Sequence, residues 1–323
     1  MGATGSRAST LAPWQRCEQR SGTDLMYAAR TMGMAAQLLR IPGTADAPTA
    51  ATMMASHFLR AGLDRLLIAA HGPAGGSGRL HAAARACGLP VLGPDPRAIA
   101  RAYDKLLCRQ RLAFHNVPVP RTVALPHPDR VAATRLVFRL GWPCSHKPRP
   151  GSAGALNRKN SGPKALAMAL AGRREDSLEP DLLVERKLDG REITVVVLDG
   201  RVLGMAEVSR SIEGGVSRIE TMVCPPSLDR VHASGLGNIA LRACAALELL
   251  EGPTCVDMVL TERDNEVVLE VEPLPPVHRD SIVARVARAA GMSYPQLCAR
   301  MLAGKVADAL AAADTLTAGA AAL

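Results

Sequence analysis

The feature that most constrains the fold is the order of segments between residues 65 and 92. A short apolar run, Arg65–Ala70, ends in a glycine-rich turn, His71–Gly78, and the amphipathic stretch after it closes at Gly88. A second apolar segment, Pro90–Leu92, follows directly. Strand, glycine turn, helix and strand in this order predict a βαβ unit with a parallel sheet. Since the chain has 323 residues, we expect an α/β protein of two or three lobes.

The segments around this unit are less regular. Residues 1–22 are polar and rich in Arg, Ser and Thr, which predicts a loose leader. The apolar spacing predicts helices over Asp24–Leu39, Pro48–Ala61 and Arg97–Phe114. The tail after Asp308 consists largely of Ala and Thr, and we expect it to fray.

Two antiparallel hairpins are expected in the second half of the chain. Glu192–Leu198 and Arg201–Val208 flank Asp199-Gly200, which is a strong hairpin signal. A glycine-containing loop is expected to follow over Ser209–Ser217. The second hairpin joins two strands around a turn near residues 264–265.

This second hairpin carries three acidic residues. Glu270 and Glu272 alternate along one strand and therefore share a face, and the turn places Asp257 roughly opposite them. Like charges this close repel strongly unless cations lie among them, and carboxylate oxygens suit Mg²⁺. A solvated acidic face is the alternative. The intervening Val259 and Val271 predict burial on one side and favour the metal.

A second candidate site is the loop that follows Lys147, with the sequence Lys-Pro-Arg-Pro-Gly-Ser-Ala-Gly. Its glycines let successive backbone N–H groups turn toward one anion, and Ser152 adds a hydroxyl donor. A lysine at a strand end offers a positive charge to phosphate. The loop is not a Walker A motif because no Gly-Lys-Ser/Thr follows, and a plain surface loop is the alternative.

Two weaker patterns complete the set. The extended segment Leu182–Leu188 could present backbone groups to an adenine edge, and Glu192 beyond it could reach a ribose diol. An ordinary buried strand with a charged exit has the same pattern. The neighbouring pair Asp104-Lys105 on a helix is usually surface charge unless other site residues join it.

In this order and spacing, residues 68–302 resemble the D-alanine–D-alanine ligases of the ATP-grasp superfamily. The stretches that carry the resemblance are LLIAAHGPAGGSGRLHAAARACGLPVLGPDPRAIARAYDK, GWPCSHKPRPGSAG, LLVERKLDGREITVVVLDG, CPPSL, CVDMVLTERDNEVVLEVEPLPP and DSIVARVARAAGMSYPQL.

The resemblance implies an α/β ATP-grasp fold preceded by a small parallel-sheet domain. The implied divisions are a leader at 1–22, an N-terminal α/β domain at 23–103, a central ATP-grasp subdomain at 104–185, a C-terminal catalytic subdomain at 186–308 and a flexible tail at 309–323.

The resemblance also implies roles for particular residues. Expected to bind ATP are Lys105, Lys147, Gly151, Ser152, Gly154, Glu185, Arg186, Lys187, Leu188 and Glu192. Expected to hold two Mg²⁺ ions, with Mn²⁺ as an alternative, are Asp257, Glu270 and Glu272. Expected to act on the reacting groups are Lys147, Ser152 and Ser281, the last at the carboxylate of the second substrate.

The chain departs from the family at several substrate positions. Cys255 stands where the family has an arginine two residues before the metal-binding aspartate, and Glu272 stands where it has an asparagine. The segment between Ala206 and Cys224 is short, with Arg210 and Arg218 as its only cations. The family's first βα unit is not recognisable before Ala55.

Composition narrows the expected partners. The net charge is +9, but aromatic residues make up only 2% of the chain, so no aromatic-studded basic stripe exists for nucleic acid. No apolar run reaches membrane-spanning length. The eight cysteines are scattered without a Cys-x-x-Cys pair, which fits a reducing cytoplasm. We expect small amino-acid substrates and, from the resemblance, a homodimer.

Three functions stay open on the sequence. The first is ATP-dependent synthesis of D-alanyl-D-alanine for peptidoglycan through an acyl phosphate. The second is ATP-grasp ligation of another amino acid or a hydroxy acid. The third is a nucleotide-binding homologue with little catalysis, in line with Cys255 and the short segment after Ala206.

Overall fold

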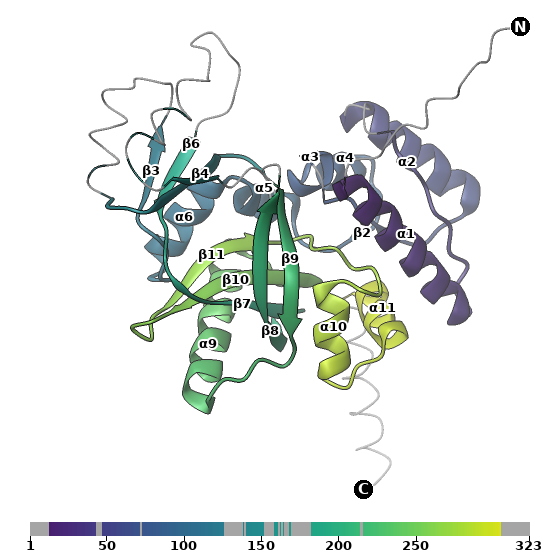
Figure 1. Ribbon diagram of the computed structural model, residues 1–323. Helices are drawn as coiled ribbons and strands as arrows, with labels where there is room; N and C mark the ends of the chain where they lie inside the picture. Colours follow the sequence, from purple (N-terminus) through teal and green to yellow (C-terminus); the bar gives the residue numbers. More distant parts are fainter. Residues whose placement is uncertain are drawn as a thin grey trace, which may run out of the picture.

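The computed structural model describes residues 13–42, 47–71, 73–125, 140–151, 158–160, 182–213 and 216–304, with Phe138, Gly162, Lys164 and Met168 as single residues. Three sheets and the helices around them make up this part of the chain (Figure 1). The sequence also predicts a helix over Pro163–Leu170, and this segment lies almost wholly outside the described residues. The tail after Asp308 lies entirely outside them.

The N-terminal unit contains a small two-stranded parallel sheet, as the sequence predicts. Leu66 pairs with Val91, and Leu67 pairs with Leu92. The elements of this unit are α1 (Pro13–Thr31), α2 (Ala47–Ala61), β1 (Leu66–Leu67), α3 (Pro73–Gly76), α4 (Arg79–Ala86), β2 (Val91–Leu92) and α5 (Pro96–Tyr103).

The start of the chain differs from its predicted form. Helix α1 begins at Pro13, within the segment expected to be a loose leader, and ends at Thr31 instead of Leu39. The reason is tertiary packing, because Leu25 and Ala28 are buried in a core cluster with residues of the C-terminal lobe. Ser21 is also buried, and its hydroxyl accepts a hydrogen bond of 3.2 Å from the Val277 N–H. A polar composition therefore concealed a helix that this lobe stabilises.

The predicted helix over residues 97–114 is two helices, α5 and α6 (Lys105–Phe114). Asp104 separates them because its backbone is extended, with φ −79° and ψ 99°. Its carboxylate accepts hydrogen bonds from the Leu106 and Leu107 N–H groups and so caps α6. The break presents Lys105 in the first turn of a new helix, where it is 5% exposed.

A four-stranded antiparallel sheet follows in the order β3-β6-β4-β5. Its strands are β3 (Thr122–Leu125), β4 (Cys144–Pro148), β5 (Arg158–Asn160) and β6 (Leu182–Arg186). Lys147 pairs with Leu183, and Ser145 pairs with Glu185. Both predicted strands, at 143–147 and 182–188, are present with ends that differ by one or two residues.

The largest sheet is antiparallel with the order β11-β10-β7-β8-β9. Its strands are β7 (Gly190–Leu198), β8 (Arg201–Glu213), β9 (Val216–Val223), β10 (Pro253–Thr261) and β11 (Glu266–Glu272). Both predicted hairpins are confirmed, and Asp199 and Gly200 turn the first of them with φ of 49° and 74°. The loop expected over Ser209–Ser217 is instead mostly strand, because β8 continues to Glu213 and pairs with β9.

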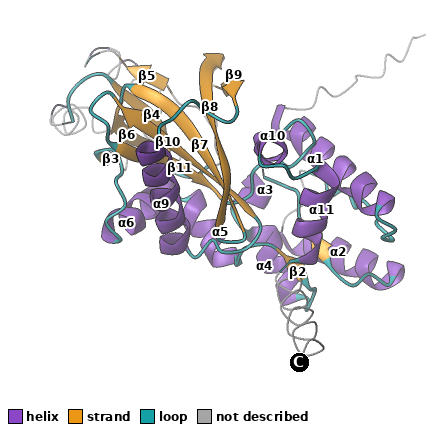
Figure 2. Cartoon of the chain, turned by 90° about the horizontal axis from the view of Figure 1, so that it is seen from below, coloured by secondary structure: helices purple, strands orange, loops and turns teal. Residues whose placement is uncertain are grey.

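Helices cover both faces of this sheet (Figure 2). On one face α9 (Arg230–Leu247) packs with α5 and α6 over a core that includes Val195, Val256 and Leu236. On the other face α10 (Ile282–Ala289) and α11 (Tyr294–Ala303) cover Val196 and Cys255. The alternation along β7 and β10 thus supplies apolar residues to two cores, with few aromatic residues in either.

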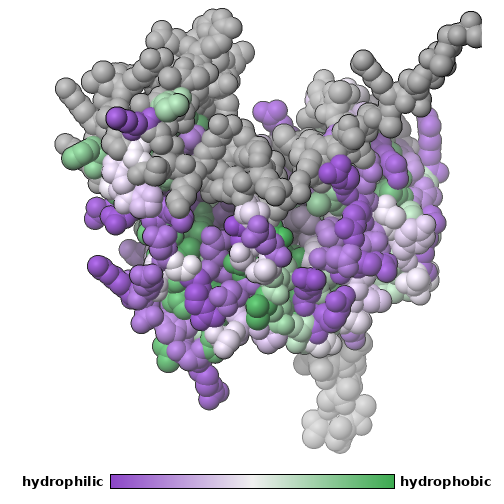
Figure 3. All heavy atoms as spheres, viewed as in Figure 1, coloured by the Kyte–Doolittle hydropathy of each residue, from purple (hydrophilic) through white to green (hydrophobic). Residues whose placement is uncertain are grey.

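The view in Figure 3 shows a mostly hydrophilic exterior with hydrophobic residues scattered in small groups. This distribution agrees with helices that cover both faces of the large sheet, so that its apolar side chains are withdrawn from water.

Candidate active site

The strand pair β10–β11 sets the positions of the candidate metal-binding carboxylates. Asp257 lies directly opposite Glu270, as the sequence predicts, and Glu272 lies opposite Cys255. The side chains of Asp257 and Glu270 are only 14% and 21% exposed. Two carboxylates are therefore neighbours across the ladder in a setting that is largely removed from water.

Each of these carboxylates has a cation of the protein beside it. Asp257 Oδ1 lies 3.0 Å from an Arg210 guanidinium nitrogen and accepts a 2.5 Å hydrogen bond from the Thr194 hydroxyl. Glu270 Oε1 lies 3.1 Å from Lys105 Nζ. Burial alone would raise the pKa of Glu270, but Lys105 and Lys147 lower it below its usual value. Glu270 is thus held ionised.

The described residues contain no group of three or more His, Cys, Asp and Glu side chains arranged to hold a metal ion. The donor chemistry nevertheless fits Mg²⁺, because this ion is usually held by one or two carboxylates together with phosphate oxygens and water. The cross-strand pair Asp257 and Glu270 supplies that minimum. The metal roles of Asp257, Glu270 and Glu272 remain a prediction.

Lys105 joins the carboxylate pair to the start of the candidate phosphate loop. Its Nζ donates to the Gly151 carbonyl oxygen as well as contacting Glu270. The same loop is tied to the α5–α6 break, since Arg149 binds Asp104 at 2.9 Å. Gly151 has φ of 143°, which glycine adopts readily. The structure therefore brings Lys105, Gly151 and Glu270 together, whereas Ser152 and Gly154 lie outside the described residues.

A buried ionic cluster lies beside this group. Glu185 accepts from Arg109 Nε at 2.9 Å and from Lys147 Nζ at 2.8 Å, and all three side chains are at most 7% exposed. Burial would raise the pKa of Glu185, but the two cations outweigh it and lower the pKa to about 2. Arg109 also donates to the carbonyl oxygens of Val268 and Leu269 on β11. The cluster thus joins the small sheet to the strand that carries Glu270.

The segment predicted to border adenine leaves the small sheet at Arg186. Glu185 itself turns its carboxylate into the buried cluster, so only its backbone remains to face a ligand. Lys187 N donates to the Pro143 carbonyl oxygen, and its amine pairs with Asp189 at 3.2 Å. The nucleotide roles of Arg186, Lys187, Leu188 and Glu192 remain predictions.

The predicted substrate residue Ser281 caps α10. It is buried, and its Oγ accepts a hydrogen bond of 3.3 Å from the Ala284 N–H.

A separate contact joins α1 to the end of the first parallel strand. The Glu18 carboxylate accepts a 2.8 Å hydrogen bond from the His71 N–H. Burial lowers the pKa of His71 to about 4, so this imidazole is neutral at pH 7. It is therefore poorly suited to hold a proton there.

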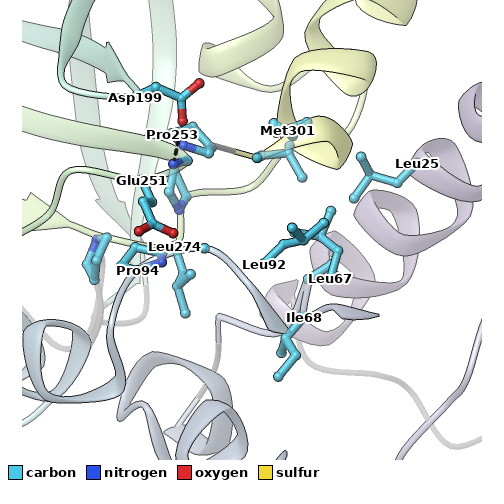
Figure 4. Close-up of a pocket in the computed structure, with 17 residues that line it drawn as sticks. Leu25, Leu67, Ile68, Leu92, Pro94, Asp199, Glu251, Pro253, Leu274 and Met301 are labelled. Carbon is cyan, nitrogen blue, oxygen red and sulfur yellow. Dashed lines mark hydrogen bonds between the residues drawn. The ribbon is translucent and has the colours of Figure 1, made fainter. Parts of the chain in front are cut away.

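An apolar cavity of about 50 Å³ separates the parallel sheet from the C-terminal lobe (Figure 4). Leu67, Ile68 and Leu92 line it from one side, and Leu274 and Met301 line it from the other. None of the candidate phosphate-binding or metal-binding residues lines this cavity, so it lies apart from the candidate active site.

The sequence did not indicate two residues that the structure places beside the candidate metal-binding carboxylates and the buried ionic cluster. Arg109 lies one helical turn after Lys105 on α6. Two basic residues four positions apart share one face of a helix, and this spacing was the signal available in the sequence. Thr194 faces Asp257 only because β7 pairs with β10 in the observed register. No signal in the sequence gives that pairing.

Comparison with known proteins shows the family to which the chain belongs. Residues 115–303 match the family model described as D-ala D-ala ligase C-terminus. The D-alanine–D-alanine ligase of Pseudomonas entomophila is 32% identical over 253 residues, which are 76% of this chain and 77% of that protein. The chain belongs to the D-alanine–D-alanine ligase family. A ligase of the same name from Synechococcus is 30% identical over 252 residues, covering 75% and 76% of the two chains.

Solved structures of a D-alanine–D-alanine ligase and of a D-Ala:D-Ser ligase share the fold. The enzyme from Bacillus anthracis superposes with a TM-score of 0.74 at 17% identity, over 91% of this chain and 93% of that one. The VanG D-Ala:D-Ser ligase from Enterococcus faecalis gives 0.66 at 21% identity, over 74% and 72%. The predicted family and the predicted ATP-grasp fold are confirmed.

Membership in this ligase family implies ATP, a divalent metal and small amino-acid substrates in general terms. Of the helices in the described ranges, none has the length and apolar character needed to cross a membrane.

Proposed function

We propose that this chain is an ATP-dependent ligase that joins two molecules of D-alanine through an acyl phosphate. The observation that carries the proposal is the gathering of Lys105, Gly151 and Glu270, with Asp257 across the ladder from Glu270. These groups offer one cation for phosphate and two carboxylates for a metal at one place. The product would serve peptidoglycan precursor synthesis, as the family assignment supports.

The reaction has two bond-forming steps. An oxygen of the first substrate's carboxylate attacks the γ-phosphorus of ATP, and the bond to ADP breaks. The amine of the second substrate, in its unprotonated form, then attacks the acyl carbon and the C–N bond forms. The C–O bond to phosphate breaks, phosphate leaves with the bonding electron pair, and the proton that the nitrogen loses is taken up by the departing phosphate. Because ATP supplies the activation, the protein's task is to position the reactants and balance their charge.

The residues of the chain divide that task. Lys105 and Lys147 would bind phosphate oxygens, and Glu192 would bind the ribose. Two Mg²⁺ ions, or Mn²⁺ in their place, would be held by Asp257, Glu270 and Glu272 and would neutralise charge on the phosphates. Ser281, at the N-terminus of α10, would bind the carboxylate of the second substrate. Ser152 and Gly154, which lie outside the described residues, would also bind phosphate.

The proposal is tested by incubating the purified chain with ATP, Mg²⁺ and single D- or L-amino acids, and measuring phosphate release and dipeptide by mass spectrometry. We expect D-alanine alone to give equal amounts of phosphate and D-alanyl-D-alanine. Product from a different amino or hydroxy acid would replace the substrate assignment while keeping the reaction.

One observation favours a second candidate, a nucleotide-binding protein with little ligation. Cys255 is 5% exposed, and burial raises its pKa well above the usual value, so it carries no charge where the family has arginine. ATP binding without phosphate release under any amino acid would support this alternative.

We also propose that the chain acts in the cytoplasm as a homodimer, following the family resemblance. Light scattering after size-exclusion chromatography tests the dimer, and a monomer at micromolar concentration would contradict it.

A further inference from the structure

Arg210 joins two carboxylates that the proposed function assigns to different parts of the nucleotide. It lies on β8, and its guanidinium is 3.0 Å from Glu192 Oε2 and 3.0 Å from Asp257 Oδ1. A third contact, at 3.3 Å, reaches the Thr194 hydroxyl. The side chain is only 21% exposed. Arginine stays protonated in such a setting, so a permanent positive charge is fixed there.

The position of this charge follows the course of a bound nucleotide. Glu192 is the proposed ribose contact, and Asp257 is a proposed metal ligand. Because the phosphates connect the ribose to the metal in a metal–ATP complex, a group that touches both acids lies beside the phosphate chain. The other cations near the carboxylates, Lys105 and Lys147, come from α6 and β4 rather than from this sheet.

The neighbouring strand does not supply that charge. Cys255 lies two residues before Asp257, and its side chain is 5% exposed within the apolar cluster that α10 and α11 cover. Among the residues that the structure describes, Arg210 is therefore the basic side chain that pairs with Asp257.

We infer that Arg210 is a phosphate-binding residue of the nucleotide site. The inference rests on the proposed function, since it uses the assigned roles of Glu192 and Asp257. A guanidinium presents parallel N–H groups that match two phosphate oxygens. When a divalent cation balances Asp257, the donors that face this carboxylate become available to the phosphates.

A different role would be to neutralise Asp257 and nothing more. In that case loss of Arg210 would free the carboxylate for the metal, and metal–nucleotide binding would stay equal or become tighter. Phosphate binding requires the opposite result. The two roles are thus separated by the direction of one change.

The experiment measures, by titration calorimetry, the dissociation constants of AMP-PNP with Mg²⁺ and of adenosine alone. For Arg210→Gln we expect AMP-PNP affinity to fall about 10- to 100-fold, the range for lost charge-assisted hydrogen bonds. Adenosine affinity should stay unchanged. An unchanged or tighter AMP-PNP affinity relative to adenosine would overturn the inference.

Arg191→Gln is the matched control. Arg191 lies on β7 of the same sheet, but its guanidinium binds Glu207 at 3.0 and 2.7 Å and the Ser227 carbonyl oxygen at 2.8 Å. The Arg191→Gln variant loses one positive charge but keeps the contacts of Arg210 with Glu192 and Asp257. Its AMP-PNP affinity should therefore match that of the wild type. An equal loss in both variants would mean that overall charge is the cause and would overturn the inference.

A further variant keeps the test decisive. If Arg210→Gln does not fold, Arg210→Lys keeps the charge near Asp257 but cannot bind two phosphate oxygens in parallel, and it must still weaken AMP-PNP relative to adenosine. A wild-type chain that binds neither ligand would contradict the proposed function as well, whereas wild-type binding with no effect at Arg210 contradicts only this inference.

Discussion

At the scale of single residues, the site is a set of acids each held by its own base. Glu270 pairs with Lys105, and Asp257 pairs with Arg210. Glu185 pairs with both Arg109 and Lys147. Buried carboxylates would otherwise be protonated, because burial disfavours the charged form. The pairing keeps Glu185 and Glu270 ionised. Acidic and basic side chains therefore lie together where a ligand that carries phosphates and a metal could bind.

The first residue-scale prediction concerns Glu270→Gln. We expect turnover of ATP to fall at least about 100-fold, because the amide cannot supply the charge that a divalent metal needs. Lys105 keeps its contact with the Gly151 carbonyl oxygen, so circular dichroism should show a folded chain. Glu266→Gln, at the far end of β11, is the control and should keep its activity. Normal turnover in Glu270→Gln would rule out the metal role.

The second prediction concerns pH and Glu185. Its pKa in the folded chain is about 2, below the usual 4.5, so the paired carboxylate adds stability above about pH 4.5. That contribution is lost as the pH falls through the folded pKa near 2. Glu185→Gln should lower the free energy of unfolding by about 3–5 kcal/mol at pH 7, because two buried cations lose their partner.

Urea unfolding of wild type and Glu185→Gln at pH 7, 4.5 and 2.5 checks this prediction. The difference between the two chains should be largest at pH 7 and should shrink between pH 4.5 and 2.5. A difference that stays constant over this range would show that ionisation of Glu185 does not stabilise the fold.

At the scale of elements, one glycine allows the chain after β6 to join the large sheet as β7. Gly190 begins β7 with φ of 153°, and a Cβ at this position would lie 2.2 Å from the Leu260 carbonyl oxygen. The strand that follows carries Glu192 and pairs with β10, which carries Asp257. Close approach of these two backbones therefore sets the distance between the proposed ribose and metal contacts.

We predict that Gly190→Ala lowers the free energy of unfolding by about 1–3 kcal/mol through backbone strain. It should also weaken AMP-PNP binding, because β7 must shift away from β10. Gly237→Ala is the matched control on α9, where a Cβ would meet Val202 at an ordinary 3.6 Å. There alanine should be neutral or stabilising by up to about 1 kcal/mol, since it favours helix. Equal stability of the two variants would contradict the prediction.

At the scale of the whole molecule, the N-terminal helix is part of the C-terminal core. Leu25 of α1 packs in one cluster with Val277, Val283 and Met301. Asp24 accepts a 2.9 Å hydrogen bond from the Arg279 N–H, close to Ser281. The helix thus supports the segment between the carboxylate strand and the proposed substrate residue, and α1 packs in the same core as α10 and α11.

Leu25→Ala tests this connection. The side chain is 6% exposed and lines the small cavity of Figure 4, so we expect a loss of about 2–3 kcal/mol, at the lower end for a buried leucine. Urea unfolding measures the loss. Tyr27→Ala on the same helix removes a side chain that is 56% exposed and should cost less than about 0.5 kcal/mol. If Leu25→Ala were as stable as the wild type, packing of α1 in the C-terminal core would not stabilise the fold.

Local chemistry in the sequence determined much of the molecule. The Asp199-Gly200 hairpin, the opposition of Asp257 and Glu270, and the βαβ unit all depend on short-range turn preferences and on alternation along a strand. The family likeness in the second half also lies within contiguous stretches.

Tertiary structure alone decided the rest. Helix α1, the break at Asp104 and the extension of β8 to Glu213 depend on partners far away in the chain. The same holds for the meeting of Arg210 with Asp257, which requires that β8, β7 and β10 lie side by side in one register. Burial and ion pairing act between such distant residues, and their energies exceed the local preferences that a linear pattern records.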